Sequence, residues 1–89
     1  MEKVKKYVIG IYKIGEHLAK NVSFGSGNDS LEQALDELVA MYSYDENFNN
    51  DFSENDLREN MRFSVDNKVY AVFECWFDEG TGDMEELRT

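Results

Sequence analysis

The 89-residue sequence contains no proline, one cysteine and one histidine. A single cysteine cannot form an internal disulfide, and its scarcity fits a reducing compartment. A structural zinc site takes about four Cys or His ligands, so this class of site is excluded. Cys75 lies between Phe73 and Phe77 in an alternating segment, which predicts a buried structural thiol. His17 lies next to an expected turn, so we expect it at the surface.

Long apolar runs and phosphate-binding loops are missing too. The stretch MEKVKKYVIGIYKIG is interrupted by Gly10, Lys13 and Gly15, so we interpret it as a strand and not as a signal peptide. No run approaches the roughly 20 apolar residues of a membrane span. Residues 25–29, GSGND, match neither glycine-rich nucleotide motif, and no local catalytic triad is present. We therefore expect a cytoplasmic protein that is not an enzyme and has no membrane partner.

Basic residues are missing from a long central segment. Residues 1–28 hold five lysines and two acids, a net charge of +3. Residues 29–57 hold nine acids and no base (−9), and residues 58–89 hold eight acids and four bases (−4), which gives −10 in total. This charge disfavours direct binding to nucleic acid or to an anionic membrane. It favours a protein partner with a basic, nucleic-acid-binding surface, or a metal ion.

Hydrophobic periodicity predicts a single domain, residues 1–89, of the α+β class. Strands are expected over 4–14 and, more weakly, 17–24. The main helix starts after Ser30, which forms a capping box with Gln33, and ends near Tyr42.

Ser53 and Asp56 suit the cap of a second, short helix, and residues 61–77 suit a β-hairpin that turns at Asp66-Asn67. The predicted order is β-β-α-(α)-β-β, an antiparallel sheet of about four strands with one main helix packed on it. We expect a loose acidic tail from about residue 78.

The stretch DENFNNDFSEND, residues 45–56, contains five acids and four asparagines. Counted from Asp45, its oxygen-bearing side chains fall at positions 1, 3, 5, 7, 9 and 12, the ligand positions of a calcium loop. The stretch resembles an EF-hand loop or, because position 12 is Asp, a dockerin repeat. Asn50 stands where that family has glycine. The resemblance implies an alternative function as a calcium-binding module, with these ligands: Asp45, Asn47, Asn49, Asp51 and Asp56. Otherwise we expect no cofactor.

The same acidic block also suits a surface that imitates a polyanion. Glu32 and Asp36 are one helical turn apart, about 6 Å along the axis, which is comparable to within a few ångströms with successive phosphates. In size, charge and lack of catalytic motifs, the chain resembles small acidic inhibitors from phages and mobile elements, namely anti-CRISPR and anti-restriction DNA mimics. Immunity proteins against nuclease toxins look similar. The resemblance implies a non-catalytic inhibitor of a nucleic-acid-handling enzyme, such as a CRISPR effector, acting in a bacterial host cell if phage-encoded.

The expected partner-binding residues are the acids of the block and the aromatic residues among them: Glu32, Asp36, Glu37, Tyr44, Asp45, Glu46, Phe48, Asp51, Glu54, Asp56 and Glu59. The alternative interpretation is an acidic face that only keeps the protein soluble. A second candidate surface is one face of the last hairpin, with Tyr70, Glu74 and Trp76, which fits a second face of the core equally well.

Overall fold

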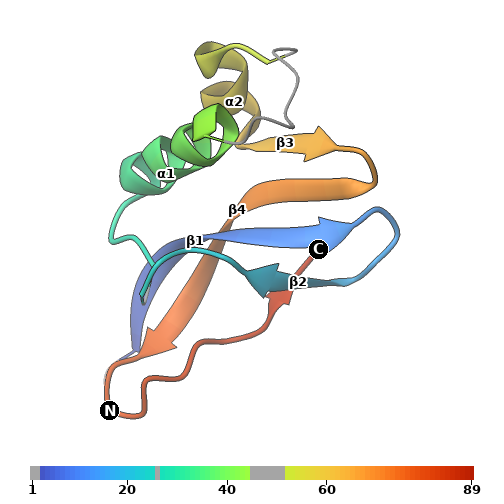
Figure 1. Cartoon of the computed structure of the whole chain (residues 1–89). Helices are drawn as coiled ribbons and strands as arrows, with labels where there is room; N and C mark the ends of the chain where they lie inside the picture. Colours follow the sequence, from blue (N-terminus) through green and yellow to red (C-terminus); the bar gives the residue numbers. More distant parts are fainter. Residues whose placement is uncertain (1–2, 26, 45–51) are drawn as a thin grey trace.

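A computed structural model of the chain describes residues 3–25, 27–44 and 52–89. These residues form an antiparallel sheet and two helices, so the predicted α+β class is confirmed (Figure 1). The elements along the chain are β1 (Lys3–Lys13), β2 (Leu18–Asn21), α1 (Leu31–Tyr44), α2 (Glu54–Asn60), β3 (Arg62–Val65), β4 (Lys68–Asp78) and β5 (Leu87–Arg88).

The first strand forms the centre of the sheet. The strand order is β3-β4-β1-β2-β5, and β1 pairs with β4 along its whole length, from Lys3 opposite Asp78 to Lys13 opposite Lys68. Successive side chains of a strand point to opposite faces. Val8 and Ile9 are both fully buried, because each face of β1 supports a core of its own.

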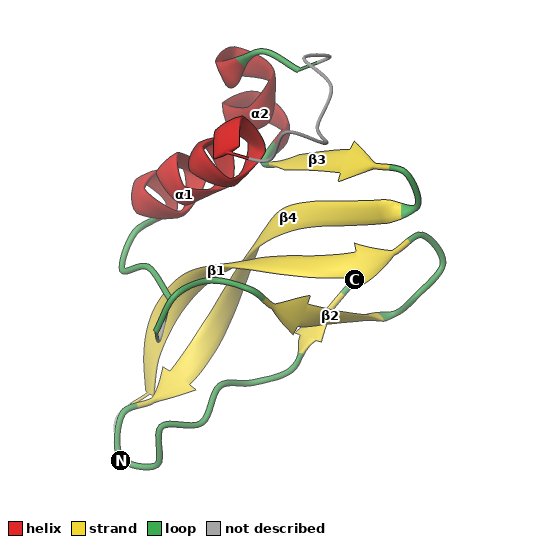
Figure 2. Ribbon diagram, in the orientation of Figure 1, coloured by secondary structure: helices red, strands yellow, loops and turns green. Residues whose placement is uncertain are grey.

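The helices cover one face of the sheet and build the larger core (Figure 2). Helix α1 buries Ala34, Leu38 and Tyr42, which are four residues apart and so lie on one side of the helix. Leu38 and Tyr42 pack with Ile9 of β1, and Leu57 of α2 and Phe63 of β3 complete this core: Ile9, Leu38, Tyr42, Leu57 and Phe63.

Both helices begin at the caps that the sequence predicts. Ser30 Oγ accepts a hydrogen bond from the Gln33 N–H at 3.2 Å, while the Gln33 side chain reaches back to the Asp29 N–H. At α2, Ser53 and Asp56 form a reciprocal capping box. The hairpin turn at Asp66-Asn67 is also confirmed, with Asp66 at φ 56°.

The prediction of a loose tail from residue 78 is wrong, because this segment runs from the end of β4 to the edge of the sheet beside β2. Met84 forms an isolated β-bridge with Phe77 of β4, and Leu87 then pairs with Ala19 of β2. Leu87 is only 5% exposed and packs with Val8 and Cys75 in the second core. The sheet therefore has five strands where about four were predicted.

The second core is tightly packed over Gly10. A Cβ atom at this glycine would lie 2.6 Å from Phe73 Cε2 and 3.1 Å from the Ala19 methyl group. The aromatic ring of Phe73 therefore occupies the space that any larger residue would need. None of the helices in the described part of the chain is both long and apolar enough to span a membrane.

Candidate functional site

Two adjoining helices bring together acidic residues that are far apart in the sequence. Helices α1 and α2 contact each other at the β3 side of the sheet (Figure 1). Five exposed carboxylates lie on them, and we call this group the acidic helical surface: Glu32, Asp36, Glu54, Asp56 and Glu59. The lysines of residues 3–20 lie on β1 and β2, so charge of opposite sign is separated between the helices and these strands.

Arg58 is the single basic residue of the two helices. Its Nη2 atom lies 2.6 Å from Asp36 Oδ1 of α1 and 3.6 Å from Glu54 Oε1 of its own helix. The hydrogen bond to Asp36 raises the pKa of the Arg58 guanidinium above its ordinary value, and desolvation acts in the opposite direction. With five carboxylates and one guanidinium, the acidic helical surface keeps a formal charge of −4.

Glu37 lies apart from this surface. Its side chain is half-buried, and its Oε1 atom accepts hydrogen bonds from Ser23 Oγ and from Asn28 Nδ2. Ser23 Oγ also accepts a hydrogen bond from the Ile9 N–H of β1. Glu37 therefore ties α1 to the loop that precedes it and to the central strand, so it does not extend the row that Glu32 and Asp36 begin.

The aromatic residues expected as anchors divide into two groups. Tyr44 is 87% exposed at the end of α1 and is available for contact. Phe52 is half-buried and packs edge-on against Tyr42, with ring centroids 6.0 Å apart. The Phe52 N–H also donates to the Tyr42 hydroxyl at 3.2 Å, so Phe52 has a structural role.

Part of the predicted site lies outside the described residues: Asp45, Glu46, Phe48 and Asp51, together with the calcium-ligand candidates Asn47 and Asn49. Of the proposed calcium ligands, the structure describes Asp56, whose Oδ2 accepts the Ser53 N–H in the capping box. Residues 3–25, 27–44 and 52–89 contain no group of three or more Cys, His, Asp or Glu side chains placed to hold a metal ion.

The second candidate surface, on the last hairpin, is divided between core and solvent. Tyr70 stacks on Phe63, with centroids 4.8 Å apart and planes 12° apart, on the helix-covered face. Trp76 is 46% exposed, and Lys5 Nζ lies 5.5 Å from its ring centre and 2.8 Å from Glu74. The hydrogen bond to Glu74 raises the pKa of Lys5. The three residues therefore do not form one contact patch.

Cys75 and His17 lie where the sequence predicts. The Cys75 side chain is buried, and burial, followed by the charge of Glu85, raises the pKa of its thiol. His17 is exposed, and its carbonyl oxygen accepts the Thr89 N–H at 2.9 Å.

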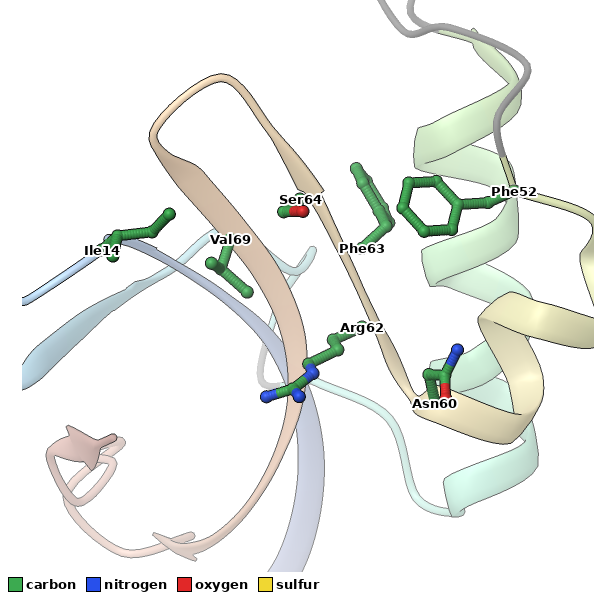
Figure 3. A pocket seen from close by; sticks show the side chains of 7 residues that line it. All are labelled: Ile14, Phe52, Asn60, Arg62, Phe63, Ser64 and Val69. Carbon is green, nitrogen blue, oxygen red and sulfur yellow. The ribbon is translucent and has the colours of Figure 1, made fainter.

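Sequence analysis did not predict a pocket beside the edge strand β3. Its volume is about 370 Å³, and it is lined by Ile14, Phe52, Asn60, Arg62, Phe63, Ser64 and Val69. Figure 3 shows Phe52 and Phe63 beside each other on the helix side of β3, while Arg62 points away from them. The alternation of side chains along RFSV could have predicted that Arg62 and Phe63 point to opposite faces of β3. The position of Phe52 beside Phe63 could not be predicted in this way, because it depends on tertiary packing.

Comparisons with protein-family models, with curated proteins and with solved structures find no match to this chain.

Proposed function

We propose that this protein is a non-catalytic inhibitor that binds a nucleic-acid-handling enzyme, such as a CRISPR effector or another defence nuclease, through the acidic helical surface. The supporting observation is the concentration of charge: five exposed carboxylates lie on two adjoining helices that carry a single basic residue. Such a surface is complementary to a basic groove that holds the phosphates of DNA or RNA.

The helical scaffold gives this surface a fixed geometry. Glu32 and Asp36 are spaced by one turn of α1, and Leu57 fixes α2 against α1 by packing in the core that holds Leu38 and Tyr42. Preorganised charges lose little conformational freedom on binding, which favours affinity. Complementary fields would accelerate association, and added salt would weaken it. Tyr44 supplies an exposed aromatic side chain at the end of α1.

A displacement assay tests the proposal. Proteins of a bacterial lysate are bound to immobilised duplex DNA and eluted with the purified chain at constant ionic strength. We expect the wild type to elute a small set of proteins that includes a nuclease or another nucleic-acid enzyme. The triple variant Glu32→Lys, Glu54→Lys, Glu59→Lys should elute none of them, because it reverses three charges of the surface. Asp56 is left unchanged because it caps α2.

A control triple variant places the same change of charge elsewhere. Glu79, Asp83 and Glu86 are exposed in the C-terminal segment, so Glu79→Lys, Asp83→Lys, Glu86→Lys matches the first variant in net charge. This control should elute the same proteins as the wild type. Circular dichroism establishes that both variants fold. Equal loss of elution in the two variants would show an effect of net charge alone, and no elution by the wild type would overturn the proposal.

A further inference from the structure

Strand β3 is an edge strand whose outer main-chain groups pair with no strand that the structure describes. It pairs with β4 on one side, and no strand of the described chain lies on its other side. Phe63 lies opposite Tyr70, and the Val72 N–H donates to the Met61 carbonyl. Since bonded and non-bonded pairs alternate in an antiparallel ladder, Met61, Phe63 and Val65 bond to β4. The N–H and C=O groups of Arg62 and Ser64 therefore point outward.

The pocket lies beside this outward edge. The half-buried Phe52 provides aromatic surface on its helix side, where Phe63 is itself only 1% exposed, and Arg62 and Ser64 line it as exposed residues of the strand itself (Figure 3). A groove with an apolar part next to free main-chain groups is the arrangement by which an extended peptide adds to a sheet. In that mode the main-chain hydrogen bonds give affinity, and pockets for alternate side chains give specificity.

Arg62 determines which charge a bound peptide should carry. Arg58 and Arg88 each form a salt bridge within the chain, whereas Arg62 forms none with any residue that the structure describes. An acidic side chain on an added strand would lie on the same side as Arg62 and pair with it. A basic side chain at that position would be repelled.

We propose that the outer edge of β3 binds an extended segment of a partner protein by strand addition, with an acidic side chain facing Arg62 and a large apolar side chain in the pocket beside Phe52. A second copy of this chain fits less well. The segment RFSV supplies no acid to face Arg62, and association of two copies brings together net charges of −10. The proposal is independent of the function of the acidic helical surface.

Peptide titration with NMR detection tests the proposal. The probes are two acetylated and amidated heptapeptides, TVEFTVT and TVKFTVT, which differ only in the central charge. In the free protein, the amide protons of Arg62 and Ser64 should exchange rapidly, and those of Phe63 and Val65 slowly. The Glu peptide should protect Arg62 and Ser64 from exchange and bind about three- to fivefold more tightly than the Lys peptide.

Two variants separate strand addition from other modes of binding. Ser64→Pro removes an outward N–H, which an edge strand tolerates, and should weaken binding of the Glu peptide about tenfold. Arg62→Glu should reverse the preference, so that the Lys peptide binds more tightly. The Glu32→Lys, Glu54→Lys, Glu59→Lys variant should still bind the Glu peptide, which separates failure of this proposal from failure of the proposed inhibitor function.

Three results would overturn the proposal. One is the absence of protection at Arg62 and Ser64 with either peptide, and another is unchanged charge preference in Arg62→Glu. The third is a dimer in analytical ultracentrifugation that Ser64→Pro dissociates, because the edge would then be occupied by a second copy of the chain.

Discussion

Arg58 of α2 and Asp36 of α1 are 22 residues apart in the sequence, and their side chains meet at 2.6 Å. The one base of the two helices thus pairs with an acid of each helix. Although residues 29–57 contain no base, their charge is partly balanced by the residue that follows them.

Replacing Arg58 should strengthen the acidic helical surface at little cost to the fold. In Arg58→Gln the formal charge of this surface changes from −4 to −5, so we expect more efficient displacement of DNA-bound proteins. The melting temperature should decrease only slightly, because solvent-exposed ion pairs contribute little to stability. Arg88→Gln, which removes an exposed arginine from β5, is the charge-matched control. An equal gain in the control would indicate that net charge, and not this surface, governs displacement.

The C-terminal segment should contribute measurably to stability through Leu87. Leu87→Ala removes a side chain that packs on Val8 and Cys75, so we expect the free energy of unfolding to fall by about 2–4 kcal/mol. Leu18→Ala, at a half-exposed position of the neighbouring strand β2, should cost about 0.5 kcal/mol. Urea denaturation measures both values. Similar small losses of unfolding free energy in the two variants would mean that the C-terminal segment does not stabilise the second core.

The buried thiol of Cys75 should make stability depend on alkaline pH. Burial raises its pKa in the folded state, so the folded chain keeps a proton that the unfolded chain loses near pH 8.5. The stabilisation is therefore complete below that pH and is lost as the pH rises through the folded pKa. The free energy of unfolding should fall more between pH 7.5 and 9.5 in the wild type than in Cys75→Ala. Parallel pH profiles would exclude this contribution.

Calcium should not stabilise the fold. Asn50 occupies the position where EF-hand loops have glycine, and the described ligand candidate Asp56 is engaged in capping α2. We expect the same melting temperature in 5 mM calcium as in EDTA, with magnesium as a control for ionic strength. An increase specific to calcium would instead support the calcium-binding module. Loss of that increase in Asp45→Asn and Asp51→Asn would assign it to this loop.

Local patterns predicted much of this fold, and packing between distant segments explains the rest. The caps at Ser30 and Ser53 and the turn at Asp66-Asn67 depend on neighbouring residues, so the sequence was sufficient. The C-terminal segment has an acidic composition, and its order depends on Leu87, one apolar residue that completes a distant core. A lone leucine among acids gave no periodicity from which β5 could be predicted.

Composition was sufficient to predict which segments carry the acidic residues of the candidate site. It was not sufficient to predict in which direction each side chain points. The exposed positions of Glu32, Asp36, Glu54 and Glu59 agree with the predicted helices. The inward hydrogen bonds of Glu37 and the salt bridge of Arg58 required contacts between segments that the sequence does not place side by side.

The central position of β1 has a consequence for how the chain folds. Its partners on β4 lie between 55 and 75 residues later, since Lys13 faces Lys68 and Lys3 faces Asp78. The middle of the sheet therefore cannot form until a long loop closes, and such a topology folds more slowly than one built from local contacts. Until β4 arrives, the two apolar faces of β1 remain open to water and to other chains. The speed of folding, more than the final stability, then determines how long this strand is exposed to aggregation.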